Sequence, residues 1–104
     1  MIRHIVLWRL KAQAEGRGRA ENAALIKRAL EDLQGKIPGL LKLEVGFDFS
    51  KTADSSDIAL YSEFESREAL EAYQSHPLHE AVKPMVLSAR DERRMVDYES
   101  HRSG

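Results

Sequence analysis

The stretch IRHIVLWRL, residues 2–10, alternates between the two faces of an extended chain. One face carries Ile2, His4, Val6, Trp8 and Leu10, and the other carries Arg3, Ile5, Leu7 and Arg9. A period of two residues predicts a β-strand. Because both faces are apolar in the middle, we expect the strand to be covered on both sides. Helices of the same chain are expected on one side and a second subunit on the other.

The pattern outside this strand predicts alternating helices and strands. Ile26 and Leu30 follow the helical period, and Ser66 and Pro77 suit the first residues of two further helical segments. The expected elements are a loop at 11–19, a helix at 20–33, strands at 40–49 and 57–64, helical pieces at 67–73 and 78–87, and a strand at 92–98. This β-α-β-β-α-β order predicts an α+β protein with the ferredoxin-like arrangement and an antiparallel four-stranded sheet.

Length and composition limit the function classes. A chain of 104 residues fits one domain, expected at 1–99, with a flexible tail at 100–104. The net charge of −1 argues against a nucleic-acid partner. The chain has no cysteine, and no apolar run approaches the ~18 residues of a membrane span. Residues 1–10 are too interrupted by charge for a signal peptide, so we expect a cytoplasmic protein with no membrane partner.

A four-stranded sheet with helices on one face leaves its other face bare. Ile5 and Leu7 lie on that face in the predicted arrangement. Exposed apolar surface of this kind marks an interface. We therefore expect a homodimer in which the two open sheet faces pack together into a dimeric α/β barrel.

The segment YQSHPLH, residues 73–79, carries the candidate chemistry. If the fold brings it to His4, then three histidines and the Tyr73 phenol line one cavity, and histidine transfers protons near neutral pH. Tyr73 and His76, and His76 and His79, are three residues apart and share a helix face, although Pro77 disturbs the phase. A purely structural interpretation is also open, in which His76 finishes a helix and Tyr73 belongs to the core.

Six short segments occur in an order that resembles the stress-responsive A/B barrel (Dabb) family of dimeric α+β barrels. They are HIVL (4–7), IPGLL (37–41), LEVG (43–46), FESREAL (64–70), YQSHPLH (73–79) and VDY (96–98). The resemblance covers roughly residues 1–99 and implies a homodimer of ferredoxin-like subunits. Many bacterial members have no assigned activity, some plant members are stress-induced, and one plant branch is a polyketide cyclase that needs no cofactor.

The cyclase branch supplies a specific hypothesis. Its acid/base tyrosine and histidine match Tyr73 and His79, so the resemblance implies His79 as general base, Tyr73 as donor to the developing oxyanion, and no cofactor. We expect His4, Val6, Trp8 and His76 to contact a small apolar or aromatic ligand. If Trp8 instead fills the cavity, the protein is a non-catalytic stress or ligand-binding homodimer. An accessory subunit of a partner enzyme is a third interpretation.

Two further features are left open. Either Arg93 and Met95 or Arg94, Val96 and Tyr98 face inward. An inward arginine would favour a carboxylate ligand, but a solvated edge strand is the favoured interpretation.

We predict no metal site. Three histidines are suited in principle to zinc or copper, and some family members hold magnesium with backbone carbonyls that match Gln34, Ile37 and Leu40.

Overall fold

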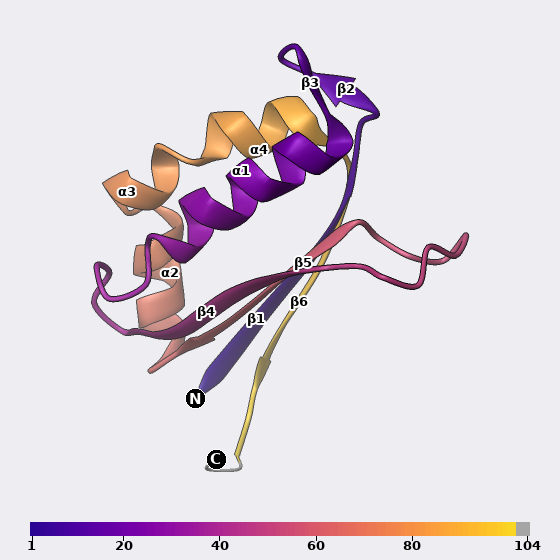
Figure 1. Cartoon of the computed structure of the whole chain (residues 1–104). Coiled ribbons are helices and arrows are strands. Elements are labelled where there is room, and N and C mark those ends of the chain that lie inside the picture. The colour runs from indigo at the N-terminus through magenta and orange to yellow at the C-terminus, as the bar shows by residue number, and fades with distance from the viewer. Residues whose placement is uncertain (102–104) are drawn as a thin grey trace.

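A four-stranded antiparallel sheet with strand order β4-β5-β1-β6 forms one layer of the molecule (Figure 1). In the computed structural model, which describes residues 1–101, the strands are β1 (Ile2–Leu10), β4 (Leu40–Phe47), β5 (Ile58–Phe64) and β6 (Arg90–Glu99). The first and last strands are neighbours, and β1 lies in the centre between β5 and β6. The predicted antiparallel four-stranded sheet is therefore confirmed.

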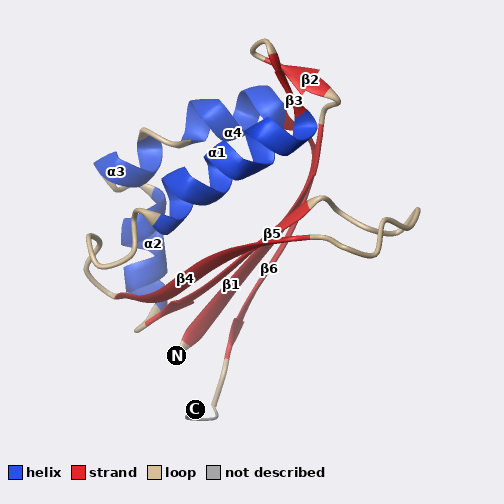
Figure 2. Ribbon diagram, viewed as in Figure 1, coloured by secondary structure: helices blue, strands red, loops and turns tan. Residues whose placement is uncertain are grey.

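The four helices of the described residues cover one face of this sheet (Figure 2). They are α1 (Arg19–Glu31), α2 (Arg67–Gln74), α3 (Pro77–Glu80) and α4 (Lys83–Ala89). The order confirms the ferredoxin-like α+β prediction, but the helical part after β5 consists of three pieces where the sequence predicted two. Pro77 and Pro84 each sit in the first turn of a piece, where proline is tolerated and the preceding helix cannot continue through it. None of the helices in the described range is long and apolar enough to cross a bilayer.

The sequence pattern missed a small hairpin between β1 and α1. Its strands are β2 (Gln13–Ala14) and β3 (Arg17–Gly18), in a region predicted as a loop. Glu15 and Gly16 form the turn with φ of 56° and 74°, as a two-residue hairpin with both central residues at positive φ requires. The buried Asn22 of α1 donates to the carbonyl of Ala14 at 3.1 Å and ties the hairpin to the helix.

The core lies between the helices and the inner face of the sheet. Its side chains include Val6, Ile26, Leu30, Phe64 and Tyr73, each at most 2% exposed. Along β1, buried residues alternate with residues of the outer face, as predicted from the period of two. On the outer face Leu7, Val96 and Tyr98 are 39%, 51% and 44% exposed. The sheet therefore has one apolar face under helices and one that is partly apolar and uncovered within the chain.

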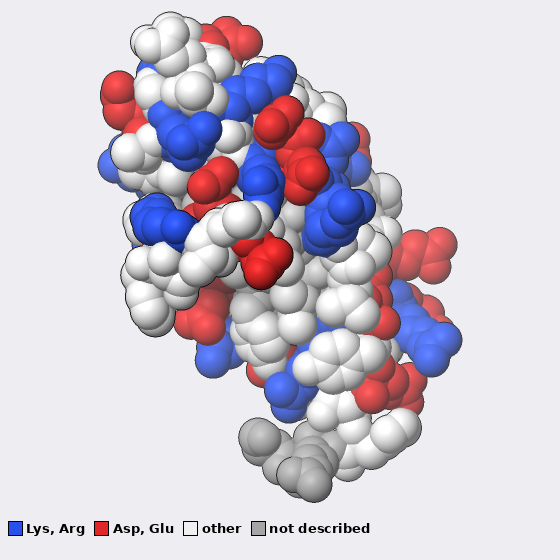
Figure 3. Space-filling model, turned by 90° about the vertical axis from the view of Figure 1, so that its right-hand side faces the viewer, with Lys and Arg blue, Asp and Glu red and all other residues white. Residues whose placement is uncertain are grey.

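Basic and acidic side chains are mixed on the face that Figure 3 shows. Blue and red groups alternate there with uncharged surface, and no extended basic area appears in this view.

Near the C-terminal end of β6, the Ser100 N–H donates to the Met1 carbonyl at 2.8 Å. Of the predicted tail at 100–104, residues 102–104 lie outside the described part of the chain.

Gly39 sets how closely α2 approaches the start of β4. Its φ is 81°, and a Cβ atom there would lie 2.5 Å from the Cβ of Ala69 in α2. We expect Gly39→Ala to lower the free energy of unfolding by about 2–4 kcal/mol, from left-handed backbone strain plus overpacking. Gly35→Ala is the matched control, because Gly35 has a φ of 83° but nothing within 4 Å of the added carbon, so that only about 1–2 kcal/mol of strain is expected. Urea denaturation of both variants measures the difference, and equal losses would contradict the close packing at Ala69.

Candidate active site

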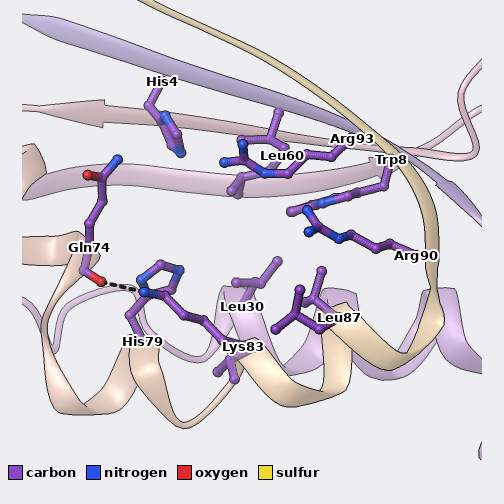
Figure 4. A pocket seen from close by; sticks show the side chains of 13 residues that line it. His4, Trp8, Leu30, Leu60, Gln74, His79, Lys83, Leu87, Arg90 and Arg93 are labelled. Carbon is purple, nitrogen blue, oxygen red and sulfur yellow. Dashed lines mark hydrogen bonds between the residues drawn. The ribbon is translucent and has the colours of Figure 1, made fainter.

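A cavity of about 310 Å³ lies between the inner face of the sheet and the helices (Figure 4). His4, Val6 and Trp8 of β1 form one wall, and His79 and Lys83 belong to the helical side. Trp8 is 5% exposed and forms part of the wall, and it leaves this volume open beside it. Trp8 therefore lines the cavity and does not fill it.

His4 is held by a carboxylate that the sequence analysis did not single out. Its Nδ1 contacts the carboxylate of Asp97, which lies opposite His4 in the pairing of β1 with β6. The ring is 4% exposed and points into the cavity (Figure 4). Because Nδ1 is engaged by Asp97, Nε2 is the ring nitrogen left for a ligand. The periodicity of β6 alone does not show that Asp97 lies opposite His4. That pairing follows from the register of β1 against β6.

Tyr73 and His79 meet, as the hypothesis of a joint site required. Their rings stack with centroids 4.1 Å apart and an interplanar angle of 19°. The centroids of the His4 and Tyr73 rings lie 6.4 Å apart in an edge-on arrangement, so the two distant segments of the sequence do come together. However, Tyr73 is 1% exposed and does not line the cavity, whereas His79 does. The phenol lies behind the His79 ring and packs on Phe64, with centroids 5.0 Å apart.

Burial controls the protonation of this stacked pair. Desolvation lowers the pKa of His79 below its ordinary value near 6.5, and the Lys83 ammonium lowers it further. The carbonyls of Gln74 and Tyr73 and the Glu80 carboxylate oppose this shift without reversing it. Burial also raises the pKa of Tyr73 to about 12. At neutral pH the imidazole is therefore neutral, with a free lone pair, and the phenol keeps its proton.

His76 does not join the cavity. Its Nδ1 accepts a hydrogen bond from the N–H of Leu78 at 3.1 Å and so caps the N-terminus of α3. The His76 backbone N–H also donates to the Tyr73 carbonyl at 3.1 Å, at the end of α2, so this residue both ends one helix and begins the next. The reason is Pro77, which begins a new helix and turns His76 into its N-cap. Two histidines, His4 and His79, line the cavity where three were expected.

The arginines of β6 are also arranged differently from the favoured interpretation of a solvated edge strand. β6 is an edge strand, but Arg93 lies opposite Trp8 and lines the cavity together with Arg90. Arg94 lies opposite Leu7 and belongs to the outer face. The structure thus selects the parity in which Arg93 faces inward. Within residues 1–101, no group of three or more histidine, aspartate or glutamate side chains is arranged to hold a metal ion.

Fold and cavity together define a ferredoxin-like α+β protein with an internal site between sheet and helices. The chain belongs to the stress responsive A/B barrel domain family, whose model matches residues 2–100. It is similar to an uncharacterised protein of Streptomyces coelicolor, with 35% identity over 82 residues that cover 78% of this chain and 81% of the relative.

Two solved structures illustrate the range of similar folds. A dimeric protein of unknown function from Bacteroides fragilis, described as having a ferredoxin-like fold, is 32% identical, with 95% of each chain covered and a TM-score of 0.84. The hydroxynitrile lyase of Passiflora edulis is 20% identical, with 99% of this chain and 96% of the lyase covered and a TM-score of 0.80. The second likeness concerns the fold alone.

The lowered pKa of His79 predicts how acid affects stability. The unfolded chain binds a proton at this residue more readily than the folded chain, so stability is lost as the pH falls below the ordinary value and through the folded pKa. We expect His79→Phe, which keeps a ring on Tyr73 but cannot titrate, to lose less thermal stability than the wild type between about pH 7.5 and pH 5.5. Thermal unfolding of both proteins measures this. Equal losses, or an NMR titration midpoint of His79 at or above its ordinary value, would contradict the desolvated environment.

Proposed function

We propose that this protein is a cofactor-independent acid/base enzyme that acts on a small, largely apolar carbonyl compound in the cavity. The observation that carries the proposal is the position of His4 and His79 on opposite walls of one cavity, in different surroundings. His79 is desolvated, whereas His4 is engaged by Asp97. Two titratable groups in contrasting environments are a common basis for an acid and a base in one site.

His79 is the proposed general base. Its neutral imidazole takes a proton from the carbon beside the carbonyl, and the electron pair moves to the carbonyl oxygen as an enolate. His4, whose Nδ1 is engaged by the Asp97 carboxylate, donates from Nε2 to that oxygen. Tyr73 then has a positioning role, because its ring is stacked on His79 and its hydroxyl is not on the cavity wall. This differs from the oxyanion-donor role that the resemblance implied for Tyr73.

An aldol cyclisation of the polyketide-cyclase type is one reaction that this chemistry would serve. It begins with the same proton abstraction and needs no cofactor. The fold is compatible with catalysis, since it also carries a hydroxynitrile lyase in Passiflora edulis. The competing proposal is a non-catalytic stress or ligand-binding protein, and the buried position of the Tyr73 hydroxyl is the observation that favours it. The proposed location is the cytoplasm, a reducing compartment to which a chain without cysteine is suited.

Hydrogen–deuterium exchange tests the chemistry without knowledge of the natural substrate. We expect the wild type to accelerate exchange of the protons beside the carbonyl of benzylacetone in heavy water, followed by NMR. His79→Phe is expected to lower the enzymatic rate about 100-fold, because general base catalysis contributes on that order. His76→Asn is the matched control, since it retains an N-cap acceptor and alters a histidine outside the cavity.

The outcomes separate the roles. A wild-type rate equal to that of buffer, or equal rates for His79→Phe and His76→Asn, would reject the acid/base enzyme and favour the ligand-binding protein. Tyr73→Phe is expected to keep the rate and the stability, because it removes a buried hydroxyl that has no protein partner. If it lowers the rate as much as His79→Phe does, Tyr73 is the oxyanion donor after all.

The outer sheet face is the proposed interface of a homodimer. Leu7 of β1 and Val96 of β6 are exposed there, near Ile5, and the similar Bacteroides fragilis protein is dimeric. We expect the chain to sediment at about twice its 11.8 kDa, and Val96→Glu to shift it to the monomer because a charge would be buried in the interface. Leu78→Glu on α3 is the control, since Leu78 is similarly exposed at 42% but on the helical side. A monomeric wild type, or dissociation by both changes alike, would reject this interface.

A further inference from the structure

The cavity has an unbalanced charge. Lys83, Arg90 and Arg93 line it, and no aspartate or glutamate is among the residues of its wall. Lys83 is occupied, because it donates to the Gln74 carbonyl at 2.8 Å and contacts the Glu80 carboxylate. Arg90 and Arg93 form no ion pair and no side-chain hydrogen bond with any residue in the described range 1–101. Two guanidinium groups are thus available to a ligand.

The arginines are placed where an anion and an apolar body fit together. Arg90 and Trp8 lie at one end of the cavity, His4 and His79 lie at the other, and Arg93 reaches between them (Figure 4). The cavity wall also carries apolar side chains, among them Leu60 and Leu87. A guanidinium recognises a carboxylate through two parallel N–H donors, and an indole ring packs well on an aromatic or aliphatic body.

The usual explanation of arginine on an edge strand is protection of that edge by solvated charge. Arg94 lies opposite Leu7 on the outer face, away from the cavity. Arg93 does not fit this explanation, since it lies opposite Trp8 and turns toward the cavity. Arg90 is half-buried, whereas Arg93 remains exposed at the cavity. The half-buried guanidinium of Arg90, which has no counter-ion, carries an unfavourable free energy that a bound anion would relieve.

We propose that the cavity binds a small carboxylic acid, with the carboxylate between Arg93 and Arg90 and the apolar body against Trp8. This deepens the proposed function and rests on it for the reactive part, since the remainder of such a ligand would extend toward His4 and His79. A volume of about 310 Å³ is near the lower end of ligand pockets, which suits an acid with one ring and a short chain.

Calorimetric titration with hydrocinnamate and its amide, hydrocinnamamide, tests the proposal. The two compounds have nearly the same shape and differ in charge. We expect the wild type to bind the acid at least about tenfold more tightly than the amide, as a hydrogen bond to a charged group contributes this much. Arg93→Gln and Arg90→Gln are each expected to weaken acid binding about tenfold and to leave amide binding unchanged. Arg94→Gln is the matched control on the same strand and is expected to leave both affinities unchanged.

Three results would overturn the proposal: no binding of the acid, equal affinities for acid and amide, or equal weakening by Arg94→Gln and Arg93→Gln. Circular dichroism shows whether each variant is folded, and Arg93→Gln alone decides the matter if Arg90→Gln does not fold. His79→Phe separates this proposal from the enzyme proposal, since the variant is expected to keep the preference for the acid. Benzylacetone has no carboxylate, so a failure of its exchange would reject the enzyme chemistry and leave the acid preference to be decided by calorimetry.

Discussion

The antiparallel pairing of β1 with β6 is the constraint on which the site depends. It places residues about ninety positions apart directly opposite each other: His4 against Asp97, Val6 against Met95 and Trp8 against Arg93. Since side chains alternate along a strand, a shift of one residue would turn Asp97 and Arg93 to the outer face. The carboxylate that holds His4 and a guanidinium of the cavity are therefore both consequences of one register. Pairing of β1 with β5 on its other side then makes β1 the central strand, whose inner face forms a cavity wall.

Local pattern was sufficient for most of the fold. The alternation of residues 2–10 and the helical period of Ile26 and Leu30 depend on one buried face, and burial of that face is what the structure shows. The pattern failed where backbone conformation, and not burial, decides the structure. The hairpin at Gln13–Gly18 has strands of two residues, too short for any periodicity, and depends on positive φ at Glu15 and Gly16. The division of the last helical segment depends on Pro77 and Pro84, which lie in the first turns of α3 and α4.

The part of the site that lies on a single strand could be predicted from the sequence. His4, Val6 and Trp8 share a strand face, so their joint presence on the cavity wall follows from the period of two. His79 reaches the same cavity because α3 and α4 cover that face. His76 was misplaced because the helix phase does not continue through Pro77. Asp97 and the inward Arg93 required knowledge of the strand register, which depends on the whole sheet and not on the sequence of β6 alone.

The buried polar atoms that lack a hydrogen-bond partner gather around the cavity. Among the described residues, the buried side-chain nitrogen and oxygen atoms without a hydrogen-bond partner are Arg3 Nε, Trp8 Nε1, Tyr73 Oη and His79 Nδ1. All except the first belong to the cavity wall or to the ring stacked behind it. An orphaned buried donor or acceptor destabilises a fold by about 1–3 kcal/mol, and apolar residues of similar shape would avoid this loss. A core shaped by stability alone would not gather such groups beside an open cavity. Three of the four therefore lie at or directly behind the proposed ligand site, and stability is commonly sacrificed where function is located.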